Sequence, residues 1–164
     1  MGSNSRDTQF ERNWKKASEK KYIRGAYHYY RPYENSAKQF RNYSKHVKLK
    51  EGDFPPILDI EKASPYGAAN LRKGVLNWLK LAEEHYKVKP VIYTGKKFYN
   101  DYLKGHVDDY PLWIASYSKR SSLDGIDWTI HQFSDKVKIN GIRGYADGNN
   151  FKGDVNDLKE MCIE

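Results

Sequence analysis

Apolar residues recur at helical spacing in several stretches of the chain. The clearest stretch covers residues 70–86 and has one apolar stripe, formed by Leu71, Val75, Trp78, Leu79 and Ala82. The same spacing predicts helices over residues 7–21 and 36–47. Shorter helices are predicted over residues 98–103 and 155–161. A stripe at this spacing is typical of a core-facing helix, so these positions are assigned to the core rather than to a binding surface.

Runs rich in β-branched and aromatic residues separate these helices and predict short strands. The runs cover residues 23–30, 56–61, 90–94, 112–117, 128–133 and 144–149. Helix and strand alternate through residue 103, which is typical of parallel βαβ units. After residue 103, strands follow one another with little helix between them. Since the chain shows no repeat and no low-complexity linker, residues 1–164 are predicted to form one domain of the α/β class.

The strand predicted over residues 56–61 ends in two carboxylates, Asp59 and Glu61. Side chains of a strand alternate between faces, so both acids share one face with Ile57, opposite Leu58 and Ile60. Two residues along a strand span about 6.5–7 Å, which is close enough for each acid to influence the other's proton affinity. A purely structural explanation needs a buried salt bridge for both acids, because an unpaired buried carboxylate is costly. The pair is therefore a candidate acid/base pair.

Chemistry in parallel α/β sheets and barrels gathers at the carboxyl ends of the strands. Acids, amides and aromatics stand at six predicted strand ends: Tyr27, Tyr29, Asp59, Glu61, Tyr93, Trp113, Tyr117, Gln132, Asp147 and Asn149. Taken singly, most of them have an ordinary structural explanation, such as core packing for Tyr93 or a turn for Asp147. Two carboxylates among aromatics fit glycoside hydrolysis, in which one acid protonates the leaving oxygen and its ionised partner steadies positive charge or activates a nucleophile.

The composition limits the other functions that the chain could have. Its net charge of +8 would attract polyanions, but the basic residues are scattered along the chain, so no nucleic-acid partner is predicted. The single cysteine, Cys162, excludes an internal disulfide, and no apolar run is long enough to span a membrane. The sequence contains no phosphate-binding loop and no His or Cys cluster at metal-ligand spacing. No cofactor and no metal are therefore predicted.

Six short segments follow one another along nearly the whole chain: Arg24-Gly25-Ala26-Tyr27-His28-Tyr29-Tyr30-Arg31-Pro32, Leu58-Asp59-Ile60-Glu61, Ile92-Tyr93-Thr94, Leu112-Trp113-Ile114-Ala115-Ser116-Tyr117, His131-Gln132-Phe133-Ser134, and Asp147-Gly148-Asn149 followed by Phe151. In this order they resemble the family 25 glycoside hydrolases, the lysozymes or N-acetylmuramidases of the Chalaropsis type. Each segment alone is a modest match, whereas the ordered set is specific.

The resemblance implies an irregular TIM-like β/α barrel whose later strands lack helices. It also implies cleavage of the β-1,4 bond between N-acetylmuramic acid and N-acetylglucosamine in peptidoglycan, outside the cell or in the periplasm. Glu61 would be the general acid and Asp59 its partner, with orientation of a substrate N-acetyl group as one role for the partner. Asp147 would complete the acidic cluster. The aromatic and amide residues at the strand ends would bind the glycan.

The chain departs from the family pattern at its N-terminus. Family members begin with a strand carrying an Asp-Val-Ser-like motif, and a second strand ends in a Lys-Ala-Thr-Glu-Gly-like motif. This chain begins near the following helix, at Arg6-Asp7-Thr8-Gln9-Phe10. We therefore expect a barrel that is incomplete at the N-terminus and exposes two open edges. The expected consequences are weak or no activity and pairing of the open edges with another copy.

Two other functions fit the same residues. A non-catalytic glycan-binding module would keep the groove and the aromatic residues without turnover. Another barrel glycosidase, such as a chitinase, would also place an Asp-x-Glu pair at the end of a strand.

Overall fold

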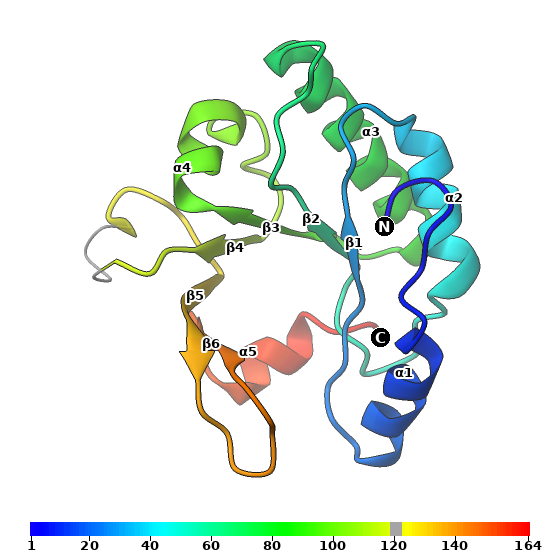
Figure 1. Ribbon diagram of the computed structural model, residues 1–164, viewed down its shortest axis with the longest axis vertical. Coiled ribbons are helices and arrows are strands. Elements are labelled where there is room, and N and C mark those ends of the chain that lie inside the picture. The colour runs from blue at the N-terminus through cyan, green and yellow to red at the C-terminus, as the bar shows by residue number, and fades with distance from the viewer. Residues whose placement is uncertain (119–122) are drawn as a thin grey trace.

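The computed structural model describes residues 1–118 and 123–164. In chain order the elements are α1 (Phe10–Glu19), β1 (Tyr27–Tyr29), α2 (Ser36–His46), β2 (Ile57–Asp59), α3 (Ala68–Tyr86), β3 (Val91–Gly95), α4 (Lys96–Phe98), the π-helical turn η1 (Tyr99–Leu103), β4 (Leu112–Ala115), β5 (Ile130–Val137), β6 (Ala146–Phe151) and α5 (Val155–Glu160). Figure 1 shows these elements arranged around one central sheet.

The six strands of the sheet lie side by side in the same order as in the chain. Neighbouring strands from β1 to β5 are parallel, and β6 pairs with β5 in the antiparallel direction. The predicted α/β class is therefore confirmed. Within the described residues the sheet does not close into a barrel, and β1 and β6 form its two edges (Figure 1).

The main core lies between the sheet and the helices α2 and α3. Leu58, Ile60, Ile92 and Ile114 point to this side and are fully buried, as is Trp78 of α3. Helix α3 also packs closely against Tyr30, the residue that follows β1. There is no room for a side chain at Gly74, since a Cβ there would overlap the Tyr30 hydroxyl. The sequence stripe predicted for residues 70–86 is thus the buried face of α3, where Leu71, Val75, Trp78, Leu79 and Ala82 are all buried.

Helix α1 differs from the other long helices in its packing. Its sequence is strongly amphipathic, yet none of residues 10–19 is buried. Phe10 and Trp14 stack with their ring centroids 5.6 Å apart, and the Arg24 guanidinium lies 4.1 Å from the Trp14 ring centroid. Arg24 also forms a buried ion pair with Asp53 at 2.7 Å. Helix α1 is therefore fixed through Arg24 near β1, and its apolar face is only partly covered.

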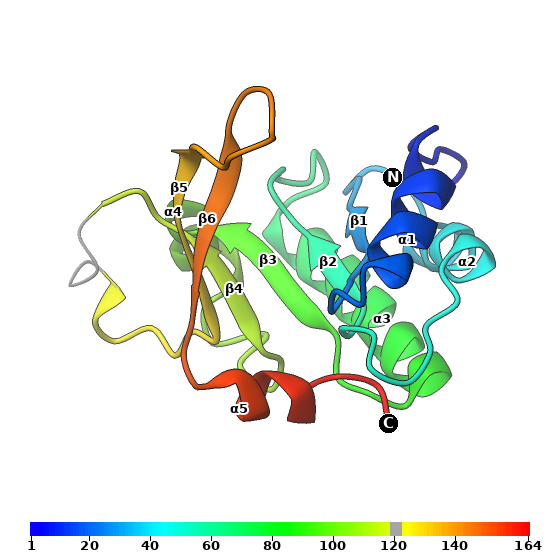
Figure 2. The same ribbon diagram turned by 90° about the horizontal axis from the view of Figure 1, so that it is seen from below.

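The C-terminal segment connects the two ends of the sheet. Helix α5 begins with a capping box in which the Asp154 side chain accepts from the backbone of Asp157, and Asp157 accepts from Asp154 in return. After α5, the backbone of Ile163 bonds to Gly52 and Asp53, with N···O distances of 2.8 and 2.9 Å. As Figure 2 shows, α5 and the tail run beneath the sheet from the β6 side towards the β1 side.

Most element boundaries differ by a few residues from the sequence prediction, and three differences have a structural cause. The strand predicted over residues 23–30 covers only Tyr27–Tyr29, while Gly25 lies close against the Phe54 side chain. The helix predicted over residues 98–103 contains a π-helical turn, which Lys104 N closes by bonding to Tyr99 O. The strand predicted over residues 128–133 begins at Ile130 and extends to Val137, because it pairs with β6 in a long hairpin.

Candidate active site

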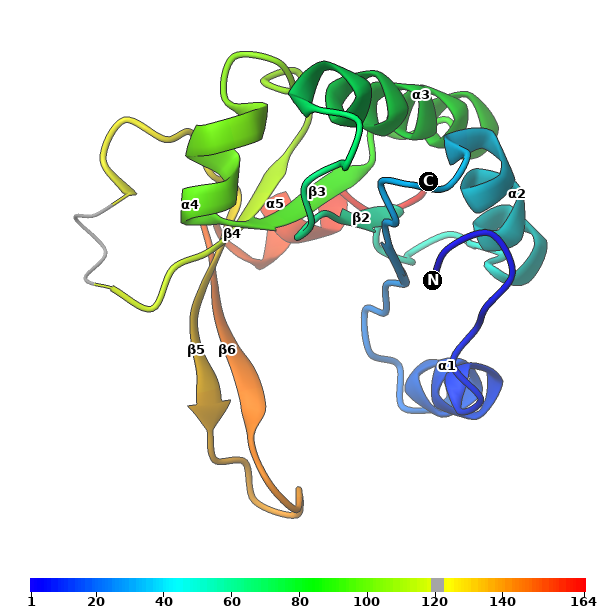
Figure 3. The same cartoon turned by 45° about the horizontal axis from the view of Figure 1, so that its top comes forward.

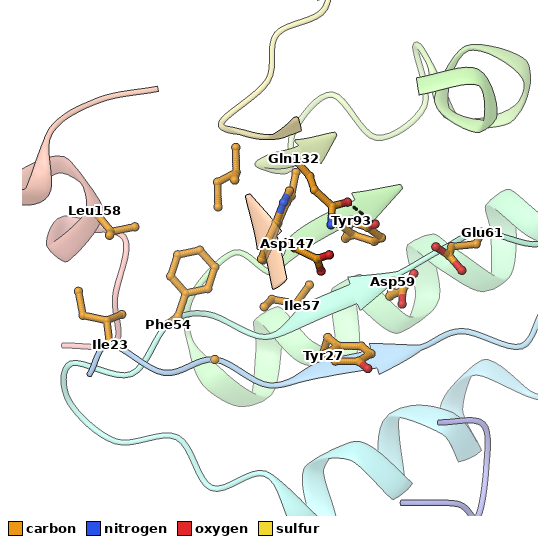
Figure 4. Close-up of a pocket in the computed structure, with 13 residues that line it drawn as sticks. Ile23, Tyr27, Phe54, Ile57, Asp59, Glu61, Tyr93, Gln132, Asp147 and Leu158 are labelled. Carbon is orange, nitrogen blue, oxygen red and sulfur yellow. Dashed lines mark hydrogen bonds between the residues drawn. The ribbon is translucent and has the colours of Figure 1, made fainter. Parts of the chain in front are cut away.

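The two acids of β2 lie on the face of the sheet opposite the main core. Leu58 and Ile60 are buried beneath the helices, whereas Ile57, Asp59 and Glu61 line a hollow of about 500 Å³ on the other face. The predicted alternation of side chains is therefore confirmed. Figure 4 shows Asp59 and Glu61 at the carboxyl end of β2, beside Tyr27 of β1.

Asp59 is unusual because its carboxyl group is buried and incompletely paired. The residue is 8% exposed, and Oδ1 has no hydrogen-bond partner in the described part of the molecule. Burial raises the pKa of Asp59 to about 7, with a further contribution from the charge of Glu61. Glu61 itself is exposed at the mouth of the hollow. Near neutral pH, Asp59 can therefore hold or release a proton next to the solvent-facing side chain of Glu61.

Tyr93 and Trp113 form one wall of the hollow. They are partners in the β3–β4 register, and their rings meet edge to face with centroids 5.7 Å apart. The Tyr93 hydroxyl donates to Gln132 Oε1 at 2.6 Å (Figure 4). Trp113 Nε1 donates to Asn149 Oδ1 at 2.9 Å. Each ring is thus held by an amide side chain from the β5–β6 hairpin, which fixes its orientation towards the hollow.

Three further tyrosines stand around the acids. Tyr27 lines the hollow and is 68% exposed. Burial raises the pKa of Tyr29, as do the charges of Glu61 and Asp59 and a hydrogen bond to Glu61. Burial also raises the pKa of Tyr117, together with the charges of Asp135, Asp147 and Glu61. Tyr117 is exposed and lies near the acids without lining the hollow.

Seven of the ten residues predicted from the sequence line this hollow: Tyr27, Asp59, Glu61, Tyr93, Trp113, Gln132 and Asp147. The other three lie nearby. Asn149 bonds to Trp113 of the wall, Tyr29 lines a neighbouring hollow, and Tyr117 is exposed near the acids. Asp147 comes from β6 and faces the hollow from the side opposite β2 (Figure 4). The structure therefore gathers acids and aromatics from β1 to β6 at one place.

Sequence reasoning missed the apolar floor of the hollow. The floor residues are Ile23, Phe54, Ile57, Ile130 and Leu158. Ile57 and Ile130 belong to predicted strands and Leu158 to a predicted helix, so each was visible as an apolar position. Their meeting was not visible, because it depends on α5 returning beneath the sheet. Among the described residues, no group of three or more His, Cys, Asp or Glu side chains could hold a metal ion.

A second hollow, of about 600 Å³, lies along the free edge of β1. Phe10 and Trp14 of α1 line it on one side, and Tyr27 and Tyr29 of β1 line it on the other. Asp59 and Glu61 border both hollows. The acids therefore stand between the main hollow and a groove at the open edge of the sheet.

Comparison with known proteins identifies the family of this site. The sequence model described as glycosyl hydrolases family 25 matches residues 1–142. The chain belongs to this family. Its fold agrees: a family 25 glycosyl hydrolase structure from Bacillus anthracis superposes with a TM-score of 0.90 at 25% identity, covering 99% of this chain and 79% of that one. This membership does not favour the chitinase or the non-catalytic alternative.

Two relatives extend the comparison. Protein YegX of Escherichia coli K12 is 40% identical over 154 residues, which cover 93% of this chain. Lysozyme M1 of Streptomyces globisporus is 29% identical over 179 residues, covering 98% of this chain. The matches span 57% of YegX and 60% of Lysozyme M1, so this family 25 chain corresponds to a little over half the length of these curated relatives.

Proposed function

We propose that this family 25 chain is a peptidoglycan hydrolase of the muramidase type, which cleaves the β-1,4 bond between N-acetylmuramic acid and N-acetylglucosamine. The observation that carries the proposal is the Asp59–Glu61 pair, which lies at the carboxyl end of a central strand and inside a hollow with an aromatic wall. The relative Lysozyme M1 supports the same reaction class. A glycan-cleaving enzyme of this class acts outside the cell or in the periplasm, where its substrate lies.

The proposed chemistry assigns a separate task to each acid. Glu61, at the mouth of the hollow, donates a proton to the leaving glycosidic oxygen. Asp59 is its partner and positions the substrate N-acetyl group next to the reacting carbon. Because the pKa of Asp59 is raised to about 7, the two acids can share one proton near neutral pH, and the proposed step needs that proton on Glu61 when the glycosidic bond breaks. Asp147 adds a third carboxyl group from the opposite side.

The aromatic residues are proposed to bind the sugar rings. Trp113 and Tyr93 present oriented faces and edges, against which the apolar faces of the sugars can pack. Tyr27, Tyr29 and Tyr117 extend this surface on the other sides of the acids. Gln132 and Asn149 hold the wall residues. Asn149 Nδ2 also donates to Asp147 O at 3.4 Å, so its second N–H and the amide nitrogen of Gln132 are the groups proposed to bind sugar hydroxyl or acetamido groups.

We further propose that the open sheet is part of an irregular β/α barrel whose β1 edge accepts additional strands. Ile57 N bonds to Ala26 O and Tyr30 N bonds to Asp59 O, so the peptide groups of Tyr27 and Tyr29 point away from β2. On that side Tyr29 O accepts from Gly2 N at 3.3 Å, which shows that this edge can take a further backbone partner. The partly covered apolar face of α1 borders the same edge. Within the described residues, the β1 side of the site is open. A second copy of the chain could supply the pairing.

Clearance of purified cell walls by the chain, followed as loss of turbidity, tests the proposed reaction. Glu61→Gln should abolish clearance but leave binding to the walls intact, whereas a binding module would have no clearance to lose. Parallel assays on chitin separate a muramidase from a chitinase. If light scattering showed a stable monomer, the proposal that two copies of the chain pair would be contradicted.

A further inference from the structure

The β5–β6 hairpin extends beyond the proposed active site. Strands β2 to β5 run parallel, so the carboxyl end of β5 lies on the same side of the sheet as the carboxyl end of β2, which carries the acids. The chain then continues outward, turns, and returns through β6 to Asp147 in the hollow. Figure 3 shows this hairpin projecting away from the rest of the sheet. Residues 136–145, here called the finger, form its outer part.

The finger is basic. It contains Lys136, Lys138 and Arg143 and no acidic residue. All three side chains are exposed, and among the described residues none of them forms an ion pair. The three positive charges are therefore exposed beyond the carboxyl ends of the strands, where a substrate would enter the hollow.

The finger also presents apolar side chains in a fixed arrangement. Ile139, Ile142 and Tyr145 are 46%, 51% and 59% exposed. At the tip, Ile142 N bonds to Ile139 O, and Gly141 adopts the positive φ of 86° that this turn requires. Lys138 Nζ lies 4.1 Å from the Tyr145 ring centroid and donates to Gly144 O. The charged and apolar groups are thus held by contacts within the finger itself.

We propose that the finger binds the acidic peptides attached to the glycan strand whose sugars occupy the hollow. This inference rests on the proposed function and identifies the part of the substrate that the hairpin contacts. In the peptide-bearing glycan, N-acetylglucosamine is uncharged and the lactyl carboxyl group of each substituted N-acetylmuramic acid is held in an amide bond, so these sugars give the three cations no charged partner. Peptides carried on N-acetylmuramic acid bring free carboxylates and small apolar side chains, which match both the charge and the apolar surface of the finger. Asp147 lines the hollow and follows the finger by two residues along the chain. A peptide attached to a sugar in the hollow would therefore reach the finger.

Binding to intact and peptide-free walls tests this inference. The Glu61→Gln form prevents turnover and serves as the background for all variants. Its binding is measured by co-sedimentation with intact sacculi and with sacculi from which an amidase has removed the peptides. Adding K136Q, K138Q and R143Q should weaken binding to intact sacculi about tenfold, since each exposed charge pair contributes a factor of roughly 1.5 to 5. The amidase frees one lactyl carboxylate on each N-acetylmuramic acid, so binding to the peptide-free glycan should also fall, but clearly less than binding to intact sacculi.

A control variant with the same charge change lies on the helices. K45Q, K73Q and K80Q remove three exposed lysines of α2 and α3, far along the chain from the finger, and should not affect either form of the wall. Equal losses from the finger and control variants would reduce the effect to overall charge and overturn the inference. An equal loss on both forms of the wall would also overturn it. Binding to vesicles that contain phosphatidylglycerol is measured in parallel. If the finger variant lost binding to these vesicles but not to intact sacculi, the finger would be a membrane contact and the inference would also be overturned.

Absence of binding to either wall preparation in the background protein would instead contradict the proposed function. The two failures are therefore distinguishable.

Discussion

Replacing Asp59 with Asn should change how the stability of the fold depends on pH. The folded state raises the pKa of this carboxyl from 3.8 to about 7, chiefly through burial. The folded chain therefore binds the proton more tightly than the unfolded chain, and this contribution to stability is complete below about pH 4. It decreases as the pH rises and is lost above pH 7. At about 1.4 kcal/mol for each pKa unit, ionised Asp59 destabilises the fold by about 4 kcal/mol above pH 8.

Asparagine has nearly the same shape and cannot ionise. Between pH 5 and pH 9, the wild type should lose about 3 kcal/mol more unfolding free energy than D59N loses. For a chain of this size, that difference corresponds to roughly 6–12 °C in melting temperature. Urea unfolding followed by circular dichroism across this pH range measures the effect. D109N, which alters an exposed carboxyl, is the matched control and should follow the wild type.

Parallel pH curves for the wild type and D59N would refute the reasoning. That result would mean that Asp59 ionises in the folded chain as easily as in the unfolded one. The buried, unpaired Oδ1 would then not control the proton affinity of the site.

Three other predictions concern the site and the core. Glu61→Gln should lower the rate of cell-wall clearance by about 10²–10⁴-fold, because the amide cannot donate the catalytic proton, and unchanged clearance would exclude Glu61 as the acid. Trp113→Ala removes a wall ring and its bond to Asn149; it should raise KM for soluble glycan fragments more than it lowers kcat, and the opposite split in steady-state kinetics would argue against a binding role. Gly74→Ala should destabilise the fold by about 1–3 kcal/mol through overlap with the Tyr30 hydroxyl, and adding Tyr30→Phe should restore stability in denaturant titrations. No rescue would show that the overlap is not the cause.

The sequence predicted best those features that depend on short-range patterns. The apolar run before Asp59 indicated a strand, and the period of two placed both acids on one face, as the hollow confirms. The stripe containing Trp78 likewise identified the buried face of α3. Family 25 resemblance came from short ordered segments and was confirmed by a match over residues 1–142.

Features that depend on long-range pairing could not be predicted in the same way. The bond from Trp113 to Asn149 exists because β6 returns antiparallel to β5, and this register was not visible in the sequence. Leu158 joins the floor of the hollow only because α5 passes beneath the sheet. The finger has no regular apolar period, so its basic and apolar surface emerged only with the hairpin. The high pKa of Asp59 likewise depends on burial, which spacing alone does not determine.

The order of the strands has a consequence for how this chain folds. Each strand lies beside the one that precedes it in the sequence, so a growing chain can add strands one at a time during synthesis. Each parallel pair still has to close a crossover before its bonds form, so these pairings are slower to form than the β5–β6 hairpin. The bonds from Ile163 to Gly52 and Asp53 join segments that are farther apart in the chain than any two neighbouring strands. The sheet can therefore assemble one strand at a time. The apolar cluster of Phe54 with Leu158 and Cys162 is completed last, when the C-terminal segment docks.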